Sequence, residues 1–242
     1  MPFFRTIISV IFVGLFMLSS LILLPVEFFI RKKSPKKATQ FSYIVITNAF
    51  RTLTFLSGST PKVYGLENIP KDRPVVFMGN HRSYYDLIIS YCYMPCPTAI
   101  YSKDGLKKAP AINVWMKCID CVFLEMGNLR QNMEAILTGI DLLKKGTSVL
   151  IFPEGKRNKG EGVLEFHAGS FKLATKTGAP IVPVVQTNTR EIFEKHFPWL
   201  HRQKTTLEFL PPIETADLSK EEQKALPEFT RQQILKAYLE KK

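Results

Sequence analysis

Residues 74–93 read PVVFMGNHRSYYDLIISYCY, and this stretch decides the fold. The apolar start predicts a buried strand over 74–78, because the run is short and rich in strand-forming residues. The apolar spacing that follows predicts a helix over 84–93. Ser83 and Asp86 match the capping-box pattern, which places the start of that helix directly after Ser83. A buried strand therefore passes into a capped helix across a short polar loop.

The same alternation continues along the chain and indicates an α/β fold. Near-continuous hydrophobic strands between helices are typical of a mixed, largely parallel central sheet flanked by helices. We assign this sheet to one α/β domain over 59–242. The further predicted strands are 98–102, 121–124, 148–152, 180–185 and 205–210. The further predicted helices are 110–118, 130–145, 166–177 and 219–240.

The first 58 residues read as a membrane-anchoring helical segment. Residues 6–26 carry no charge, and as a helix they would extend roughly 30 Å, the thickness of a bilayer core. A cleaved signal peptide is disfavoured because RKKSPKK follows the run instead of a cleavage site. Pro25 leaves both a spanning and a re-entrant helix open. Residues 41–58 predict a second, amphipathic helix at the interface, with a core helix as the alternative.

The charge balance predicts an anionic partner. The formal net charge is +12 and the pI is about 9.5, which suits nucleic acid or an anionic membrane surface. Aromatic residues are largely Phe in apolar runs, so a nucleic-acid partner is disfavoured. Basic residues after the apolar run predict that the α/β domain lies on the cytoplasmic side of the membrane. They are Arg31, Lys32, Lys33, Lys36 and Lys37.

Four cysteines occur in two close pairs, a spacing that raises the question of a zinc site. They are Cys92, Cys96, Cys118 and Cys121. The pairs lie in apolar surroundings, and a cytoplasmic domain keeps its thiols reduced. We therefore expect buried thiols and no metal.

His81 and Asp86 are the first candidate pair for catalysis. Residues five apart do not share a helix face, but His81 lies in the loop before the helix and can fold back onto its first turn. An aspartate that holds one imidazole nitrogen leaves the other as a base. No G-x-S-x-G sequence supplies a nucleophile, so the base would act on a substrate hydroxyl. The alternative is that Asp86 only caps the helix.

A second candidate segment is SVLIFPEGKRNKGEG, residues 148–162. A buried strand ends here in Glu154, followed by Lys156, Arg157 and Lys159. A carboxylate and cations at the carboxyl end of a strand suit a polar, anionic group. The alternative is a surface turn with solvated charges.

Together the two segments resemble the glycerolipid acyltransferases, in particular the 1-acylglycerol-3-phosphate acyltransferases. Three blocks in the family's order over about residues 60–190 carry the resemblance. The N-H-x4-D block is matched by Asn80, His81 and Asp86, and the V-P-V block by residues 182–184. The F-P-E-G-[TS]-R block is matched by residues 152–155 and Arg157, with Lys156 where Thr or Ser is usual.

The resemblance implies acyl transfer from acyl-CoA or acyl carrier protein to the sn-2 hydroxyl of lysophosphatidate, with no bound cofactor. His81 would be the general base and Asp86 would orient it, without a covalent acyl-enzyme. Arg157 and Lys103 would bind the phosphate, and Glu154 the acceptor hydroxyls. The full predicted substrate-binding set is Asn80, Arg82, Lys103, Arg130, Glu154, Gly155, Lys156 and Arg157.

A second departure from the family pattern concerns phosphate binding. Between His81 and Glu154 the family has a block resembling F-I-D-R after a strand, and residues 123–126 here read FLEM, so that Met126 stands in place of the arginine. Losing a charge-assisted phosphate contact weakens binding, unless Arg130 or Lys156 replaces it. Two alternatives therefore stay open: the same chemistry on another lysolipid, and a membrane adaptor that has lost catalysis.

Overall fold

A computed structural model describes residues 1–103, 110–125 and 127–241 of the chain. The strands are β1 Thr60–Tyr64, β2 Val76–Gly79, β3 Thr98–Lys103, β4 Val122–Leu124, β5 Ser148–Ile151, β6 Ile181–Thr187 and β7 Lys204–Phe209. The α-helices are α1 Pro2–Lys33, α2 Pro35–Leu56, α3 Tyr84–Tyr93, α4 Pro110–Cys118, α5 Leu129–Lys144, α6 Lys172–Thr175 and α7 Lys220–Glu240.

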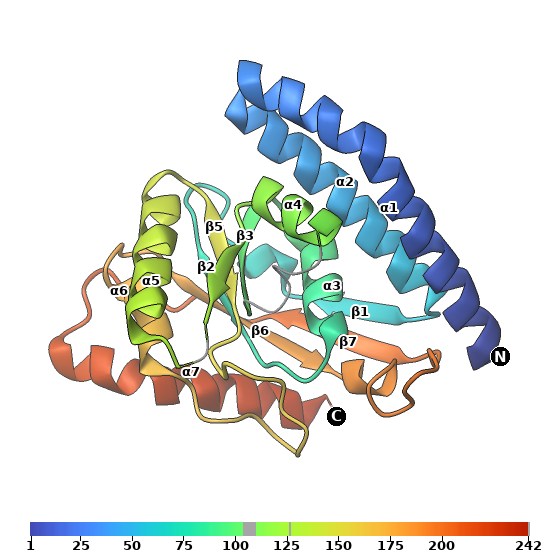
Figure 1. Cartoon of the computed structure of the whole chain (residues 1–242). Helices are drawn as coiled ribbons and strands as arrows, with labels where there is room; N and C mark the ends of the chain where they lie inside the picture. The colour runs from blue at the N-terminus through green and yellow to red at the C-terminus, as the bar shows by residue number, and fades with distance from the viewer. Residues whose placement is uncertain (104–109, 126, 242) are drawn as a thin grey trace.

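Within these residues the strands form one sheet in the order β1-β7-β6-β2-β5-β3-β4 (Figure 1). Neighbouring strands are parallel, except for the antiparallel pair β6 and β7. The predicted mixed, largely parallel sheet is thereby confirmed. Its central strands are buried along their whole length, as a sheet covered on both faces requires.

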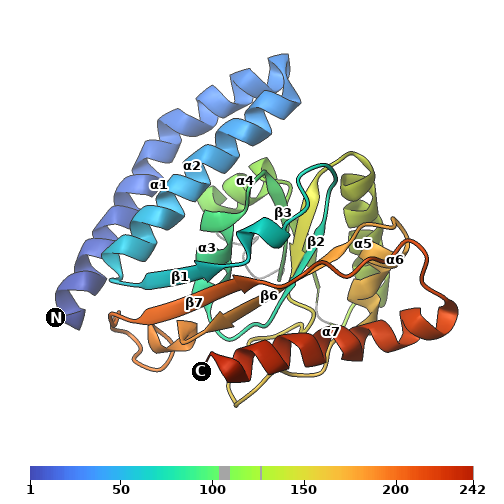
Figure 2. The same ribbon diagram turned by 180° about the vertical axis from the view of Figure 1, so that it is seen from behind.

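Helices cover both faces of the sheet (Figures 1 and 2). One face packs on α5, α6 and α7, where Leu143, Leu173 and Ile234 are buried against the strands. The other face packs on α3 through Tyr85 and Ile89. Outside α3 lie α2 and α4, and α1 packs against both of these. The N-terminal helices are therefore an outer layer on the α3 side of the sheet.

Helix α1 is docked on the α/β domain at three places along its length. Near its start, the hydroxyl of Thr6 accepts from the backbone N–H of Leu200, at 2.8 Å. In its middle, Ser20 Oγ accepts from the indole of Trp115 at 2.8 Å. At its end, Arg31 donates to the carbonyl of Cys118 at 3.0 Å. The helix is long and apolar enough to cross a membrane, yet it lies along one side of the domain.

Helix α2 differs from the expected surface helix because much of its apolar face is covered. It lies between α1 on one side and α3 and α4 on the other, and begins at Pro35, earlier than the predicted residue 41. Arg51, a charge in an otherwise apolar stretch, donates to the carbonyl of Cys92 at 3.0 Å. A cation at the end of α3 complements the partial negative charge of that helix terminus.

The predicted helix over 166–177 is confirmed only in part, because residues 168–175 are helical but do not form one regular α-helix. A 3-10 turn, Ala168–Phe171, leads into the single turn of α6. Gly169 lowers helix propensity there, and Gly178 then adopts a φ of +71° that ends the segment. Among the cysteines, Cys92 and Cys118 are buried as predicted, whereas Cys96 and Cys121 are half-buried.

Candidate functional site

The site lies where β2 passes into α3, at the carboxyl ends of the parallel strands. Asn80 fixes the exit from β2, since its amide donates to the carbonyl of Gln186 and accepts from the backbone N–H of that residue, both at 2.9 Å. Ser83 caps α3, and the capping box with Asp86 is present. Asn80 is fully buried by these bonds to β6, so its side chain positions the loop.

The predicted contact between His81 and Asp86 is present, with 3.0 Å between Nδ1 and Oδ2. The carboxylate is fully buried. The same Oδ2 accepts from the backbone N–H groups of Arg82 at 2.5 Å and Ser83 at 2.6 Å. Oδ1 accepts from the hydroxyl of Thr189 at 2.5 Å. Asp86 therefore caps the helix and holds the imidazole at the same time, and a proton on Nδ1 that donates to this carboxylate leaves Nε2 as an acceptor.

The imidazole is held from a second side by Phe152, the residue that follows β5. The two rings are stacked, with centroids 4.3 Å apart and an angle of 16° between their planes. Phe152 is the first residue of the FPEGKR segment, so this segment reaches the base through an apolar contact. The stacking and the bond to Asp86 together fix both the position and the plane of the ring.

Glu154 is buried directly behind the loop between β2 and α3, which carries His81, and only 2% of the residue is exposed. One carboxylate oxygen accepts from the backbone N–H of His81 at 2.7 Å and the other from that of Leu164 at 3.0 Å. Burial raises the pKa of Glu154 from 4.5 to about 7, although these two N–H groups favour the charged form. The carboxylate ties the backbone of His81 to residue 164.

Arg157 is the predicted cation that lies beside the base. Its guanidinium is 3.8 Å from the ring centre of Tyr84 and donates to the hydroxyl of that residue. It also pairs with Glu194 at 3.2 Å. The Glu194 carboxylate in turn accepts from the hydroxyl of Ser83 and the backbone N–H of Tyr84, both at 2.7 Å. Arg157 is thus held at the start of α3.

Other predicted binding residues lie elsewhere. Arg82 is buried under α7, where it donates to the hydroxyl of Tyr238 and, at 2.6 Å, to the carbonyl of Gly160. Arg130 projects from the surface of α5 and pairs with Glu134 at 3.3 Å. Lys156 is exposed. The side chain of Lys103 and the whole of Met126 lie outside the described residues.

Gly155, in contrast, belongs to the wall of the site. Its φ is +66°, and a Cβ there would come within 2.9 Å of the His167 ring. Glycine is required at this turn because other residues rarely adopt that backbone conformation.

A cavity of about 370 Å³ opens at the base. His81 and Arg157 line it together with apolar and aromatic side chains from α3, β3 and β4: Tyr84, Leu87, Tyr101 and Leu124. A base and a cation on one wall and an apolar lining on the other suit a substrate with a polar head and a hydrocarbon chain.

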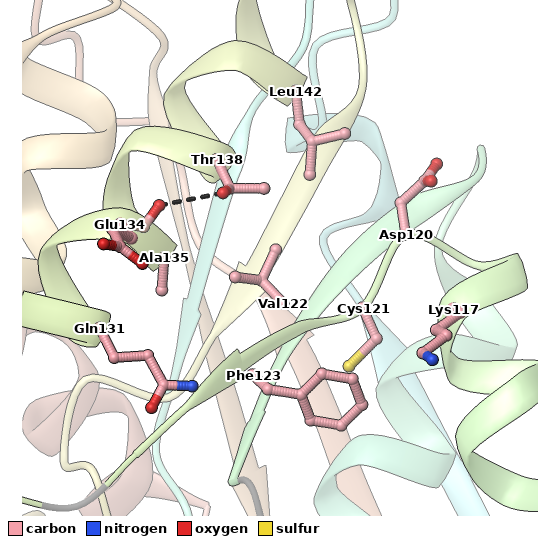
Figure 3. Close-up of a pocket in the computed structure, with 10 residues that line it drawn as sticks. All are labelled: Lys117, Asp120, Cys121, Val122, Phe123, Gln131, Glu134, Ala135, Thr138 and Leu142. Atoms are coloured by element: carbon pink, nitrogen blue, oxygen red, sulfur yellow. Dashed lines mark hydrogen bonds between the residues drawn. The ribbon is translucent and has the colours of Figure 1, made fainter. Parts of the chain in front are cut away.

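A second hollow, of about 410 Å³, lies beside β4 between the end of α4 and α5 (Figure 3). Its polar groups come from separate elements, such as Asp120 after α4 and Glu134 on α5. It contains neither His81 nor Arg157, so it is not the candidate active site.

Sequence reasoning missed three residues that shape the site: Phe152 as a stacking partner, Thr189 and Glu194. The last two lie on the connection between β6 and β7, about a hundred residues beyond the catalytic loop. The polar residues that follow the V-P-V strand, up to Thr189, were a usable signal, because side chains at the carboxyl ends of parallel strands gather at one edge of a sheet.

Comparison with known proteins places this geometry in a family. The family model described as Acyltransferase matches residues 60–187. A 1-acyl-sn-glycerol-3-phosphate acyltransferase of Borreliella burgdorferi is 32% identical over 197 residues, 81% of this chain and 79% of the relative. One of Saccharomyces cerevisiae is 28% identical over 189 residues, 77% of this chain and 62% of the relative.

A solved structure matches the whole architecture. The crystal structure of the 1-acyl-sn-glycerophosphate (LPA) acyltransferase, PlsC, from Thermotoga maritima superposes with a TM-score of 0.85 at 26% identity. The match covers 99% of this chain and 95% of that one. It therefore includes α1 and α2 as well as the sheet.

Proposed function

The chain belongs to the acyltransferase family, as an O-acyltransferase of the 1-acylglycerol-3-phosphate type, and on this premise we propose how it works. It transfers a fatty acyl group from an acyl thioester, acyl-CoA or acyl carrier protein, to the sn-2 hydroxyl of 1-acylglycerol-3-phosphate, which yields phosphatidic acid. The observation that carries the mechanism is the bond between His81 and the buried Asp86 at the mouth of the cavity.

His81 acts as the general base through Nε2. It takes the proton from the acceptor hydroxyl as that oxygen attacks the thioester carbonyl carbon. When the tetrahedral intermediate collapses, the carbon–sulfur bond breaks and the imidazolium returns the proton to the leaving thiolate. Asp86 keeps the proton on Nδ1 and stabilises the imidazolium. A positioned base of this kind contributes about 10²–10⁴-fold in rate.

Arg157 binds the acceptor phosphate. It lines the same cavity as His81, and its present partner, the Glu194 carboxylate, has the charge that a phosphate would bring. Glu154 holds the backbone of His81 in place, because its two carboxylate oxygens accept from the backbone N–H groups of His81 and Leu164. This arrangement favours positioning of the catalytic loop over direct contact with acceptor hydroxyls.

Another lysolipid acceptor is the second candidate. Met126 stands where the family pattern has an arginine, and Arg130 pairs with Glu134 on the exposed surface of α5. Arg130 and Lys156 are also not among the residues that line the cavity. Among the described residues, Arg157 is the cation that lines the cavity. A cavity with one cation binds a phosphate less strongly than a cavity with two, and this favours a different lysolipid as the alternative acceptor.

The enzyme works at a membrane surface, and we propose that α1 lies in the plane of one leaflet. A helix whose start, middle and end all contact the same domain, through Leu200, Trp115 and Cys118, cannot also pass through the bilayer with that domain on one side. Its outward row of large apolar residues, among them Leu15, Leu18 and Ile22, would face lipid. The basic junction between α1 and α2 suits an anionic, cytoplasmic surface.

An acceptor panel tests the proposal. The protein in lipid nanodiscs receives acyl-CoA or acyl carrier protein donors with lysophosphatidate and several other lysolipids, beside His81→Ala as the control. Transfer to lysophosphatidate that is lost in His81→Ala is the expected result. Transfer to a different lysolipid alone would refute the acceptor and keep the chemistry, and full activity in His81→Ala would refute the mechanism.

A further inference from the structure

The connection between β6 and β7 lies beside the first turns of α1 (Figures 1 and 2, orange beside dark blue). Two contacts join them. The backbone N–H of Leu200 donates to Thr6, and the ring of Trp199 lies 5.3 Å from that of Phe3. The connection is also ordered within itself, since the N–H of His201 donates to the carbonyl of Ile192 at 2.8 Å.

Four aromatic side chains are exposed at this junction, which we call the Trp199 patch: Phe3, Phe4, Phe197 and Trp199. Phe197 is 74% exposed and Trp199 40%, and Phe3 and Phe4 are each more than half exposed. A single exposed aromatic residue needs no explanation, but a contiguous group of large ones marks an interaction surface.

The membrane–water interface is the partner that fits this patch. Phe3 and Phe4 belong to α1, so the patch continues the apolar face of α1 onto the catalytic domain without a break in contact. Tryptophan favours the headgroup level of a bilayer, where its ring is half in hydrocarbon. Exposed cations flank the patch at Lys195, Arg202 and Lys204, and these complement anionic headgroups.

We propose that Phe197 and Trp199 insert into the same leaflet that holds α1, so that the catalytic domain contacts the bilayer at a second point. The patch shares its connection with Glu194, which is bonded to Ser83 and Tyr84 at the start of α3. Insertion therefore brings the Arg157 side of the cavity to the level of the headgroups, where the phosphate of a lysolipid lies. This second membrane contact rests on the proposed placement of α1 in one leaflet and is independent of the acceptor.

Tryptophan fluorescence tests it, because the chain has two tryptophans and Trp115 is buried against α1. The full chain is placed in anionic vesicles whose lipids carry bromine at defined depths of the acyl chain. The difference between wild type and Trp199→Phe isolates Trp199. We expect its emission to shift to the blue and to lose intensity, most strongly with the shallowest bromines.

A matched control moves the probe to the opposite face of the sheet. Phe229 on α7 is 50% exposed, so the emission that Phe229→Trp adds to the Trp199→Phe variant should neither shift nor lose intensity in the same vesicles. Emission from Trp199 that stays unshifted and unquenched would overturn the proposal. If the protein were instead a dimer that dissociates with Phe197→Ser and Trp199→Ser, the patch would be an interface between copies, and the proposal would also fail.

Discussion

Asp86→Asn separates the two roles that the Asp86 carboxylate combines. Three N–H groups point at Oδ2: the ring Nδ1–H of His81 and the backbone N–H groups of Arg82 and Ser83. The amide oxygen of Asn must therefore occupy the Oδ2 position, and the amide nitrogen faces Thr189, whose hydroxyl oxygen can accept a hydrogen bond. The orientation and tautomer of His81 are preserved, and the substitution removes the negative charge alone.

The size of the effect follows from the distance. With 3.0 Å between Nδ1 and Oδ2, the centres of charge on the imidazolium and the carboxylate are about 4 Å apart. At an effective dielectric constant of about 20, two unit charges at that distance attract by about 4 kcal/mol. Because 1.36 kcal/mol corresponds to a tenfold change in rate, Asp86→Asn should lower kcat by about 10³-fold.

The assay measures kcat at saturating acceptor in nanodiscs and the Tm of each variant. Ser83→Ala is the control, because it removes the hydroxyl that accepts from Tyr85 and donates to Glu194, costs about 1 kcal/mol of stability and leaves the charge of Asp86 in place. Its kcat should stay within severalfold of wild type. If Asp86→Asn lost stability but kept kcat within about tenfold, the carboxylate would be a helix cap, and the catalytic reasoning would be wrong.

Three further predictions concern the FPEGKR segment. Burial raises the pKa of Glu154 from 4.5 to about 7, so the folded state retains a proton that the unfolded state releases in that window. The free energy of unfolding should then fall by about 3 kcal/mol from pH 4.5 to 7, and Glu154→Gln should remove this slope in urea titrations; a slope that persists would assign it to another group. Arg157→Ala should raise the KM for lysophosphatidate about 10–100-fold, since a charge-assisted bond is worth about 1.5–3 kcal/mol, and an unchanged KM would mean that other cations hold the phosphate. Gly155→Ala should cost about 1–3 kcal/mol, because its φ is +66° and the new Cβ would come within 2.9 Å of His167; a Tm equal to that of wild type would show that the turn can relax.

Local patterns predicted the central part of the fold well. The strand, loop and capped helix over residues 74–93 are where apolar spacing and the capping box placed them, because both signals act over a few residues. Strand β1 was missed, since Thr60–Tyr64 is a short edge strand with a proline and alternating half-exposed residues. Edge strands tolerate proline and need little apolar surface, so the sequence gives them a weak signal.

The partners of the charged side chains were the part that local pattern could not supply. Arg82 sits next to His81 in the sequence, which suggested substrate binding, yet its guanidinium lies under Tyr238, 156 residues away. Glu194 carries no periodic or motif signal, and its contacts with Ser83 depend on how the β6–β7 connection folds over α3. Such pairings are decided by the packing of distant elements, which short sequence windows do not contain.

The docking of α1 along the domain determines which acceptor concentration controls the rate of the enzyme. A protein held flat in one leaflet meets lysolipid by lateral diffusion, so the relevant acceptor quantity is its mole fraction in the surface. Adding an inert lipid or detergent should slow the reaction at constant bulk acceptor, whereas diluting the whole sample should not. Kinetic comparisons among variants therefore have meaning only at a fixed ratio of acceptor to total lipid.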